Sequence, residues 1–307
     1  MKKTLKMILA TMALGMGAGS LMATTSTESA QFLGLGLQAR AASLGEAYAG
    51  FGQDLASLEY NPAGLAGSRP AYSVGYQSFV ADINGTYAAG STPLWGGMAA
   101  VSGRYIDFGT VQDAVMDAQG QVQMQSALHP SAFAGTLGFA REVSGGLSLG
   151  LAGTYFSQQV GPSQVAGGSF SMGLRESRLM VPGLSAGASV NRLGFSQENL
   201  PLPTEGRAGL GWNSSLPGLG GLGLASDLIV QGDGTSGLAA GMEWSPVKSL
   251  AARAGYNSIT AADTLDGMSG LSFGFGMKLA SLSFDYAYAP MGTLGATQRF
   301  TLTWAAR

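Results

Sequence analysis

Strict alternation of apolar residues with small or hydroxylated residues is the feature that most constrains this chain. In the stretch SLSFDYAYAP (281–290), every second residue from 282 to 288 is leucine or aromatic, and the residues between them are serine, aspartate or alanine. The stretches RFTLTW (299–304) and LSLGLAGTY (147–155) repeat the pattern. A period of two is typical of β-strands, whose successive side chains point to opposite faces. The chain is therefore predicted to be all-β.

The low charge of the chain indicates where the apolar face points. Only 11% of its 307 residues are charged, against about 25% in ordinary globular domains. A soluble β-sandwich also alternates, but its outer face would carry lysine and glutamate. Here the non-apolar positions are mainly serine, glycine, alanine and threonine, which suits the closely packed interior of a barrel. We therefore expect the apolar face to meet lipid, and keep the sandwich as an alternative that cell fractionation would decide.

The strand count favours a transmembrane antiparallel β-barrel of about fourteen strands, an even number as in bacterial outer-membrane barrels. The polar insert 106–130 reads either as an external loop or as a folded-over hairpin. The predicted strands cover residues 71–80, 84–92, 94–106, 130–141, 145–158, 165–176, 183–193, 204–213, 219–231, 235–245, 249–257, 268–278, 280–290 and 297–305.

The N-terminus predicts export. Three lysines at positions 2, 3 and 6 precede the apolar stretch MILATMALGMGAGSLMA (7–23), which ends in small residues. This arrangement is typical of a cleaved secretory signal peptide, here residues 1–23. A membrane anchor is the alternative, but the apolar stretch is short for a span of about 20 residues. With the strands, the leader predicts an outer-membrane location.

Residues 24–68 are predicted to form an N-terminal helical hatch, or plug, ahead of a barrel over 69–307. The block ARAASLGEAYAGFGQDLASL (39–58) looks helical and polar, and EYNPAG (59–64) closes it. Proline restricts the residue before it to extended geometry and ends a helix. The predicted hatch and turn residues are Arg40, Gly45, Glu46, Asp54, Asn61, Pro62, Ala63 and Gly64.

Charges within the small-residue strands are expected to face the lumen, because an arginine or lysine facing lipid costs about 2–4 kcal/mol at the bilayer midplane. If the hatch lies in the lumen, its own charges must pair with these; on a surface helix they would be solvated instead. The predicted lumen charges are Arg104, Arg141, Arg175, Asp227, Glu243, Arg253 and Asp285.

The sequence offers few side chains that could carry out enzymatic chemistry. The chain has one histidine, His129, and no cysteine, so neither a metal site nor a cofactor is expected. No phosphate-binding loop of the G-x-x-x-x-G-K-[ST] type is present. Without the three leader lysines, 13 basic residues stand against 18 acidic residues, which argues against a nucleic-acid partner. We expect a protein that is not an enzyme.

One segment resembles a known signature. ARAASLGEAYAGFGQDLASLEYNPAGLA (39–66) resembles the N-terminal signature of the PorV/PorQ and FadL-like outer-membrane barrel superfamily. EWSPVKSLAARAGY (243–256) and SFDYAYAPMGTLGATQRFTL (283–302) resemble the last strands of the PorV/PorQ branch. The resemblance covers nearly the whole chain after the leader.

The resemblance implies two alternative functions and two kinds of partner besides outer-membrane lipid. FadL-like members pass hydrophobic small molecules across the outer membrane, with a hatch inside the barrel. PorV-like members hold cargo or partner proteins of a type IX secretion machine. The first function implies an apolar ligand pocket beside the hatch, for which the candidate residues are Phe32, Leu33, Leu35, Leu37, Tyr48 and Phe51.

Overall fold

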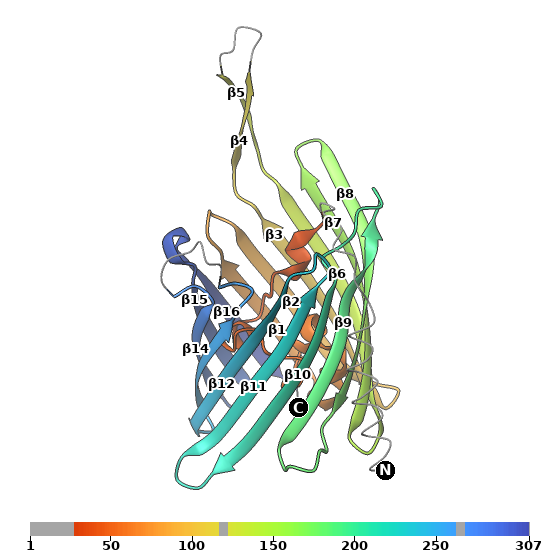
Figure 1. Cartoon of the computed structure of the whole chain (residues 1–307), viewed down its shortest axis with the longest axis vertical. Coiled ribbons are helices and arrows are strands. Elements are labelled where there is room, and N and C mark those ends of the chain that lie inside the picture. Colours follow the sequence, from red (N-terminus) through yellow and green to blue (C-terminus); the bar gives the residue numbers. More distant parts are fainter. Residues whose placement is uncertain (1–27, 117–121, 262–267, 307) are drawn as a thin grey trace.

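The computed structural model describes residues 28–116, 122–261 and 268–306. In this part of the chain, fourteen antiparallel strands form a closed barrel, in which each strand pairs with the next and β1 closes on β16 (Figure 1). The barrel strands are β1 (Ala71–Ser78), β2 (Asn84–Leu94), β3 (Gly97–Asp107), β6 (Ser131–Ser144), β7 (Leu147–Val160), β8 (Ser163–Glu176), β9 (Leu184–Ser196), β10 (Glu205–Leu216), β11 (Gly220–Gln231), β12 (Ser236–Val247), β13 (Leu250–Asn257), β14 (Leu271–Leu279), β15 (Leu282–Pro290) and β16 (Ala296–Ala305).

The predicted barrel is confirmed, since each of the fourteen predicted strands is present with its ends within three residues of the prediction. Of the two alternatives for the insert between β3 and β6, the hairpin is the one observed. Strand β4 (Val111–Met116) pairs with β5 (Val122–Leu128), and the two extend beyond the barrel (Figure 1). The single-turn helix η3 (Gly292–Leu294) lies in the loop before β16.

The two ends of the barrel differ in the length of their connections. At one end most strands are joined by short turns, such as residues 95–96 and 280–281, and 177–183 is the longest connection there. At the other end lie the β4–β5 hairpin and longer loops such as 197–204 and 291–295. We call these the short-turn end and the long-loop end.

Alternation sorts the side chains of the wall as expected. Leucine, tyrosine and phenylalanine side chains on the outer face are exposed, whereas serine, alanine, threonine and charged side chains on the inner face are buried. In β15 and β16, for example, Phe284 lies opposite Leu302 on the outer face and Asp285 opposite Thr301 on the inner face. Among the described residues, no helix is long and apolar enough to span a membrane.

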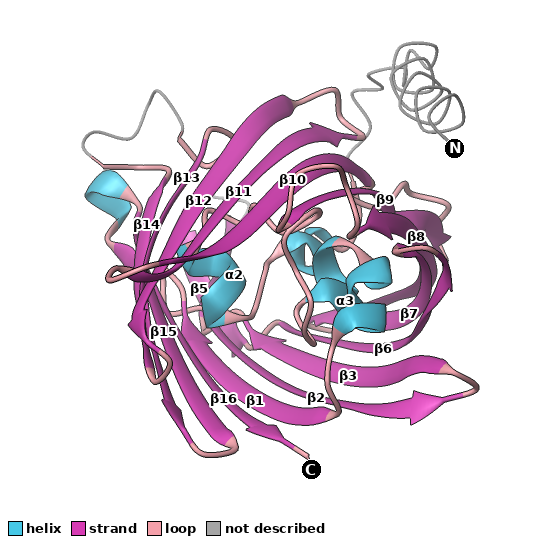
Figure 2. Cartoon of the chain, turned by 90° about the horizontal axis from the view of Figure 1, so that it is seen from below, coloured by secondary structure: helices cyan, strands magenta, loops and turns pink. Residues whose placement is uncertain are grey.

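The segment before β1 occupies the lumen, which Figure 2 shows from the short-turn end. We call residues 28–70 the plug. It contains η1 (Gln31–Gly34), α2 (Ala39–Ser43), α3 (Ser57–Tyr60) and η2 (Pro62–Gly67). The expected position inside the barrel is confirmed, but the continuous helix expected over 39–58 is wrong. Gly45 and Glu46 both have φ of 64°, a left-handed conformation that ends α2, and turns follow up to α3.

The turn at Asn61 and Pro62 forms as its sequence predicts. Asn61 is extended (φ −155°, ψ 101°), and its side chain accepts a hydrogen bond from the Ala63 N–H at the start of η2. The Asn61 amide also donates to the backbone oxygens of Ala49 (2.8 Å) and Leu174 (3.0 Å). One buried side chain therefore caps a helix, ties two parts of the plug together and binds the plug to β8.

Candidate functional site

The interface between plug and wall is the candidate site, and glycine determines its shape. A Cβ added to any of nine inward-facing glycines, one on each of the nine strands from β6 to β14, would collide with the plug. We call this set the glycine belt: Gly138, Gly150, Gly173, Gly187, Gly211, Gly223, Gly241, Gly255 and Gly274. Its partners run along the plug from Ser43 to Ala63. The plug therefore lies directly against the wall backbone over more than half of the circumference.

Hydrogen bonds hold the plug on the belt. The buried carboxylate of Asp227 accepts from the backbone N–H groups of Tyr48 (2.8 Å) and Ala49 (2.9 Å). The Arg175 guanidinium donates to the Gly50 carbonyl at 3.1 Å. Asn191 donates to the Tyr60 carbonyl at 2.9 Å. These bonds satisfy backbone groups of the plug that its short helices leave unpaired.

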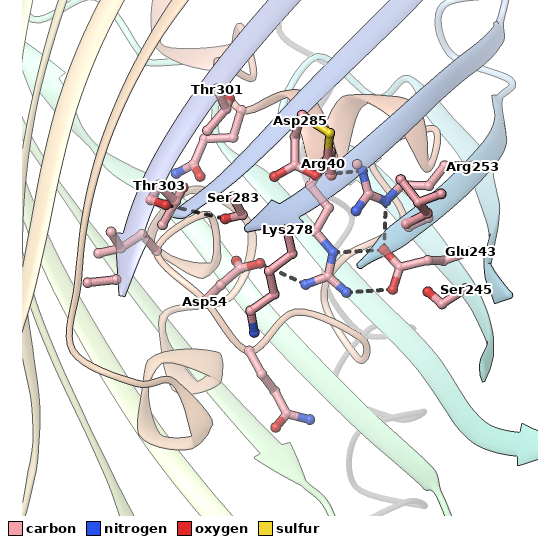
Figure 3. A pocket seen from close by; sticks show the side chains of 18 of the residues that line it. Arg40, Asp54, Glu243, Ser245, Arg253, Lys278, Ser283, Asp285, Thr301 and Thr303 are labelled. Carbon is pink, nitrogen blue, oxygen red and sulfur yellow. Dashed lines mark hydrogen bonds and ion pairs between the residues drawn. The ribbon is translucent and has the colours of Figure 1, made fainter. Parts of the chain in front are cut away.

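An ion-pair network joins α2 to the wall at the short-turn end (Figure 3). The Arg40 guanidinium donates two hydrogen bonds of 2.9 Å to Glu243 and one of 2.9 Å to Asp54. Arg253 donates to Glu243 at 2.6 Å and to Asp285 at 2.7 Å. Bidentate arginine–carboxylate pairs are strong and directional, so this network fixes α2 against β12, β13 and β15.

A second network lies deeper in the lumen. Arg207 pairs with Glu205 and with Asp227, and Arg192 also reaches Glu205 at 3.3 Å. Arg104 of β3 pairs with Glu59 of α3 at 3.1 Å, and both line a small pocket together with Arg192. Burial raises the pKa of Glu59 above its usual range, although the Arg104 charge opposes this shift.

Six of the seven predicted lumen charges face the lumen, where they contact the plug or each other, but the prediction for Arg141 is wrong. Arg141 is exposed and has the same parity as outward-facing Leu137 on β6, so it points away from the lumen. It lies near the end of β6 beside the turn at Gly96, where a long side chain can reach a polar environment.

Sequence reasoning missed four further lumen charges: Arg192, Glu205, Arg207 and Arg299. For Arg207 and Glu205 the signal was present, since they share parity with the inward glycines 209 and 211 of β10. For Arg192 the sequence carries no such signal. This residue has φ of 62° at a register shift between β8 and β9, where the alternation of inward and outward side chains is interrupted.

The predicted ligand residues form packed cores. Phe32, Leu33 and Leu37 belong to one buried cluster, against which Leu35 packs, and Tyr48 and Phe51 belong to a second. The Phe32 ring packs edge-on against Phe156 of β7, with 6.2 Å between centroids. These residues fill the space between plug and wall, and ligand binding by them stays a prediction.

A cavity of about 500 Å³ lies beside α2 at the short-turn end. The Arg40 network and the hydroxyl groups of Ser283, Thr301 and Thr303 line it (Figure 3). Most of its lining residues are charged or carry a hydroxyl or amide group, and leucine, alanine, glycine and methionine residues line the rest.

Neither catalysis nor metal binding gains support from the described residues. His129 is exposed at the base of the β4–β5 hairpin, where its Nδ1 lies 3.3 Å from the Thr110 hydroxyl. Within the described ranges, no three histidine, aspartate or glutamate side chains are grouped so that they could hold a metal ion.

Comparison with known proteins identifies the fold. No protein-family model and no curated protein matches the sequence. The structure is similar to the toluene transporter TodX of Pseudomonas putida, with a TM-score of 0.61, 12% identity, and coverage of 87% of this chain and 96% of that chain. For the toluene transporter TbuX of Ralstonia pickettii, the TM-score is 0.58 and the identity 12%, with coverage of 87% of this chain and 97% of that chain. For the monoaromatic hydrocarbon channel CymD, the TM-score is 0.60 and the identity 11%, with coverage of 89% of this chain and 98% of that chain.

Proposed function

We propose that this chain is an outer-membrane channel of the FadL-like type that passes hydrophobic small molecules into the cell. One observation carries the proposal: the chain is a closed fourteen-strand barrel with an N-terminal plug, and its fold matches TodX over 87% of its length. TodX, TbuX and CymD are described as transporters or channels for toluene or monoaromatic hydrocarbons. We propose for this chain the same kind of activity, which is passage of hydrophobic small molecules through the barrel without covalent chemistry.

The outer surface supports a membrane location. Side chains such as Leu137, Leu151, Leu210 and Leu238 stand exposed on the outer face by 51–68%. A soluble protein that exposed leucines on strand after strand would aggregate, whereas a transmembrane barrel presents such a band to lipid. In this orientation the short-turn end faces the periplasm, because outer-membrane barrels have short periplasmic turns. The cleaved leader over residues 1–23 lies outside the described residues and stays a prediction.

A PorV-like role in protein secretion is the second candidate. The β4–β5 hairpin favours it, because it extends beyond the barrel at the long-loop end, where a partner protein could pair with it or pack on it. Capture of secretion components by the intact protein, and its loss when residues 109–129 are replaced by a short turn, would support this role.

Uptake tests the channel proposal. A Gram-negative host without such barrels should take up radiolabelled toluene faster when it makes this protein in its outer membrane. The folded protein should co-fractionate with detergent-extracted outer membranes and run at a different gel position before and after boiling. Equal uptake with and without correctly located protein would refute the channel proposal.

A further inference from the structure

One sector of the plug–wall interface is built differently from the glycine belt. We call it the β1–β16 seam: the inner faces of β1 and β16, together with Tyr87 of β2. Here the nearest neighbours of an added Cβ at the inward glycines are wall atoms only, with no plug atom among them. The Tyr87 ring lies directly over Gly75, and Gln77 and Ile106 cover Gly85.

This difference has a mechanical consequence. To open the interface along the belt, the plug backbone would have to leave the wall backbone, together with its hydrogen bonds to Asp227 and Arg175. The plug meets the seam through wall side chains: the Ala39 N–H donates to the Thr301 hydroxyl (3.0 Å), and Glu46 pairs with Arg299 (3.4 Å). Rotation of these wall side chains and of Tyr87 would open the seam, and rotamer changes are faster and smaller than backbone rearrangement. The seam is therefore the sector in which a path can open while the plug stays in place.

Toward the long-loop end, the seam holds buried polar atoms without hydrogen-bond partners in the described part of the chain. Gln77 is 1% exposed, and in the described part of the chain neither its amide nitrogen nor its amide oxygen has a hydrogen-bond partner. The same holds for Nε of Arg299, directly opposite Gln77 on β16, and for the Tyr60 hydroxyl. Arg299 pairs with Glu46 at 3.4 Å, close to Tyr60.

These unpaired polar atoms indicate a binding site for a small molecule. Buried amides are nearly always hydrogen-bonded, and leaving one unpaired costs about 1–3 kcal/mol. Burial raises the pKa of Tyr60 well above its usual range, so its hydroxyl keeps its proton. The donors and the acceptor of Gln77 and Arg299 lie on directly paired residues. They adjoin an apolar layer made by Ile106, which lies beside Gln77 at Gly85, and by the Phe79 ring, whose centroid is 5.8 Å from the Arg299 guanidinium carbon.

Below this group a ladder of hydroxyls leads to the periplasmic cavity. The Tyr87 hydroxyl lies 3.0 Å from the Ser73 hydroxyl and 3.3 Å from that of Thr301. Ser73 lies 3.0 Å from the Thr303 hydroxyl. Thr301 and Thr303 both line the 500 Å³ cavity. The Tyr87 ring is therefore placed between the polar group above and the cavity below.

We propose that permeants cross the plug along the β1–β16 seam, that the Tyr87 ring gates this path, and that Gln77 selects compounds with an apolar body and one uncharged hydrogen-bonding group. The apolar layer accepts the body, and the amide of Gln77 meets the polar group. Phenol is the simplest compound of this class. The inference rests on the proposed function as a channel and names its route and substrate class.

Cysteine accessibility tests the route, since the chain contains no cysteine of its own. Ser73→Cys places a thiol in the seam, and Ser189→Cys places one on the belt side, where the Ser189 hydroxyl binds the Tyr60 carbonyl. Both serines face inward and are buried, so the two variants are matched. Whole cells that make each variant are treated with methyl methanethiosulfonate, and labelling and phenol uptake are measured. Thr301→Cys replaces Ser73→Cys if the latter does not fold.

The route predicts that Ser73→Cys is labelled and then loses phenol uptake to the level of cells without the protein, whereas Ser189→Cys keeps its uptake. Full labelling at Ser73 with unchanged uptake would overturn the inference. So would continued uptake with no labelling at Ser73, or an equal block after labelling at Ser189. Tyr87→Ala should raise uptake, because it removes the ring over Gly75.

The ratio of phenol uptake to toluene uptake tests the substrate class. Gln77→Leu should lower this ratio about fivefold, the equivalent of one uncharged hydrogen bond. An unchanged ratio would overturn the role of Gln77. If cells that make the parent protein take up neither compound faster than control cells, the proposed function fails, and the labelling contrast between Ser73→Cys and Ser189→Cys still decides whether the seam opens.

Discussion

The glycine belt makes a sharp prediction about Gly211 of β10. A Cβ at this position would lie 2.7 Å from Cα and 2.9 Å from N of Phe51. These are backbone atoms, so no side-chain rotation relieves the clash. To restore an ordinary contact of about 3.4 Å, the plug must move by about 0.7 Å at Phe51, whose ring is itself buried. Overpacking of this kind typically costs about 1–3 kcal/mol.

Gly206 on the same strand provides the matched control. It faces outward, and the nearest atom to an added Cβ is 3.8 Å away, so Gly206→Ala should change the free energy of unfolding by about 0.5 kcal/mol or less. Gly211→Ala should lower that free energy by about 1–3 kcal/mol in urea titrations of the protein in lipid. It should also raise the leak conductance in planar bilayers, because a displaced plug seals poorly. Identical unfolding and conductance for the two variants would refute the view that the plug lies against the wall backbone.

Three further predictions concern the plug and its anchors. Glu243→Gln removes the charge shared by Arg40 and Arg253 and should cost about 1–3 kcal/mol, less than the ~3–5 kcal/mol of a fully buried pair because the Arg40 side chain is 31% exposed to the cavity; an unchanged urea midpoint would contradict this. Asp227→Asn keeps the shape of the side chain but weakens its bonds to the plug backbone, and should cost about 1–3 kcal/mol in the same titration; a smaller loss than that of a surface Asp→Asn control would contradict it. Deletion of residues 24–66 should leave a barrel that still inserts but conducts ions without blocking, and unchanged permeability would show that the segment does not close the lumen.

The positions of the strands could be read from the sequence because a strand's side-chain period is a local property. Every predicted strand was found, and alternation alone sorts Asp285 inward and Phe284 outward. The same rule places Arg141 outward with Leu137. The prediction for Arg141 fails because charge alone does not decide the side of the wall, whereas the alternation along β6 does. The turn at Asn61 and Pro62 is local chemistry as well, and it forms as predicted.

The partners of the plug could not be read from the sequence. Arg40 and Glu243 are 203 positions apart, and only the closure of β1 on β16 brings the whole wall around α2. The plug's course along the glycines is likewise a relation between two backbones, which no local pattern encodes. A high glycine count is visible in the sequence, but its purpose is not.

By itself, therefore, the sequence determined the strands, the two faces of the wall and the turn that ends the plug, because each depends on neighbouring residues. The tertiary structure alone decided that the plug is a wrapped chain of short helices instead of one helix. It also decided that glycines hold the plug on one side while side chains hold it on the other. This asymmetry arises only when the barrel closes, since it depends on which inward residues face the plug at each point of the circumference.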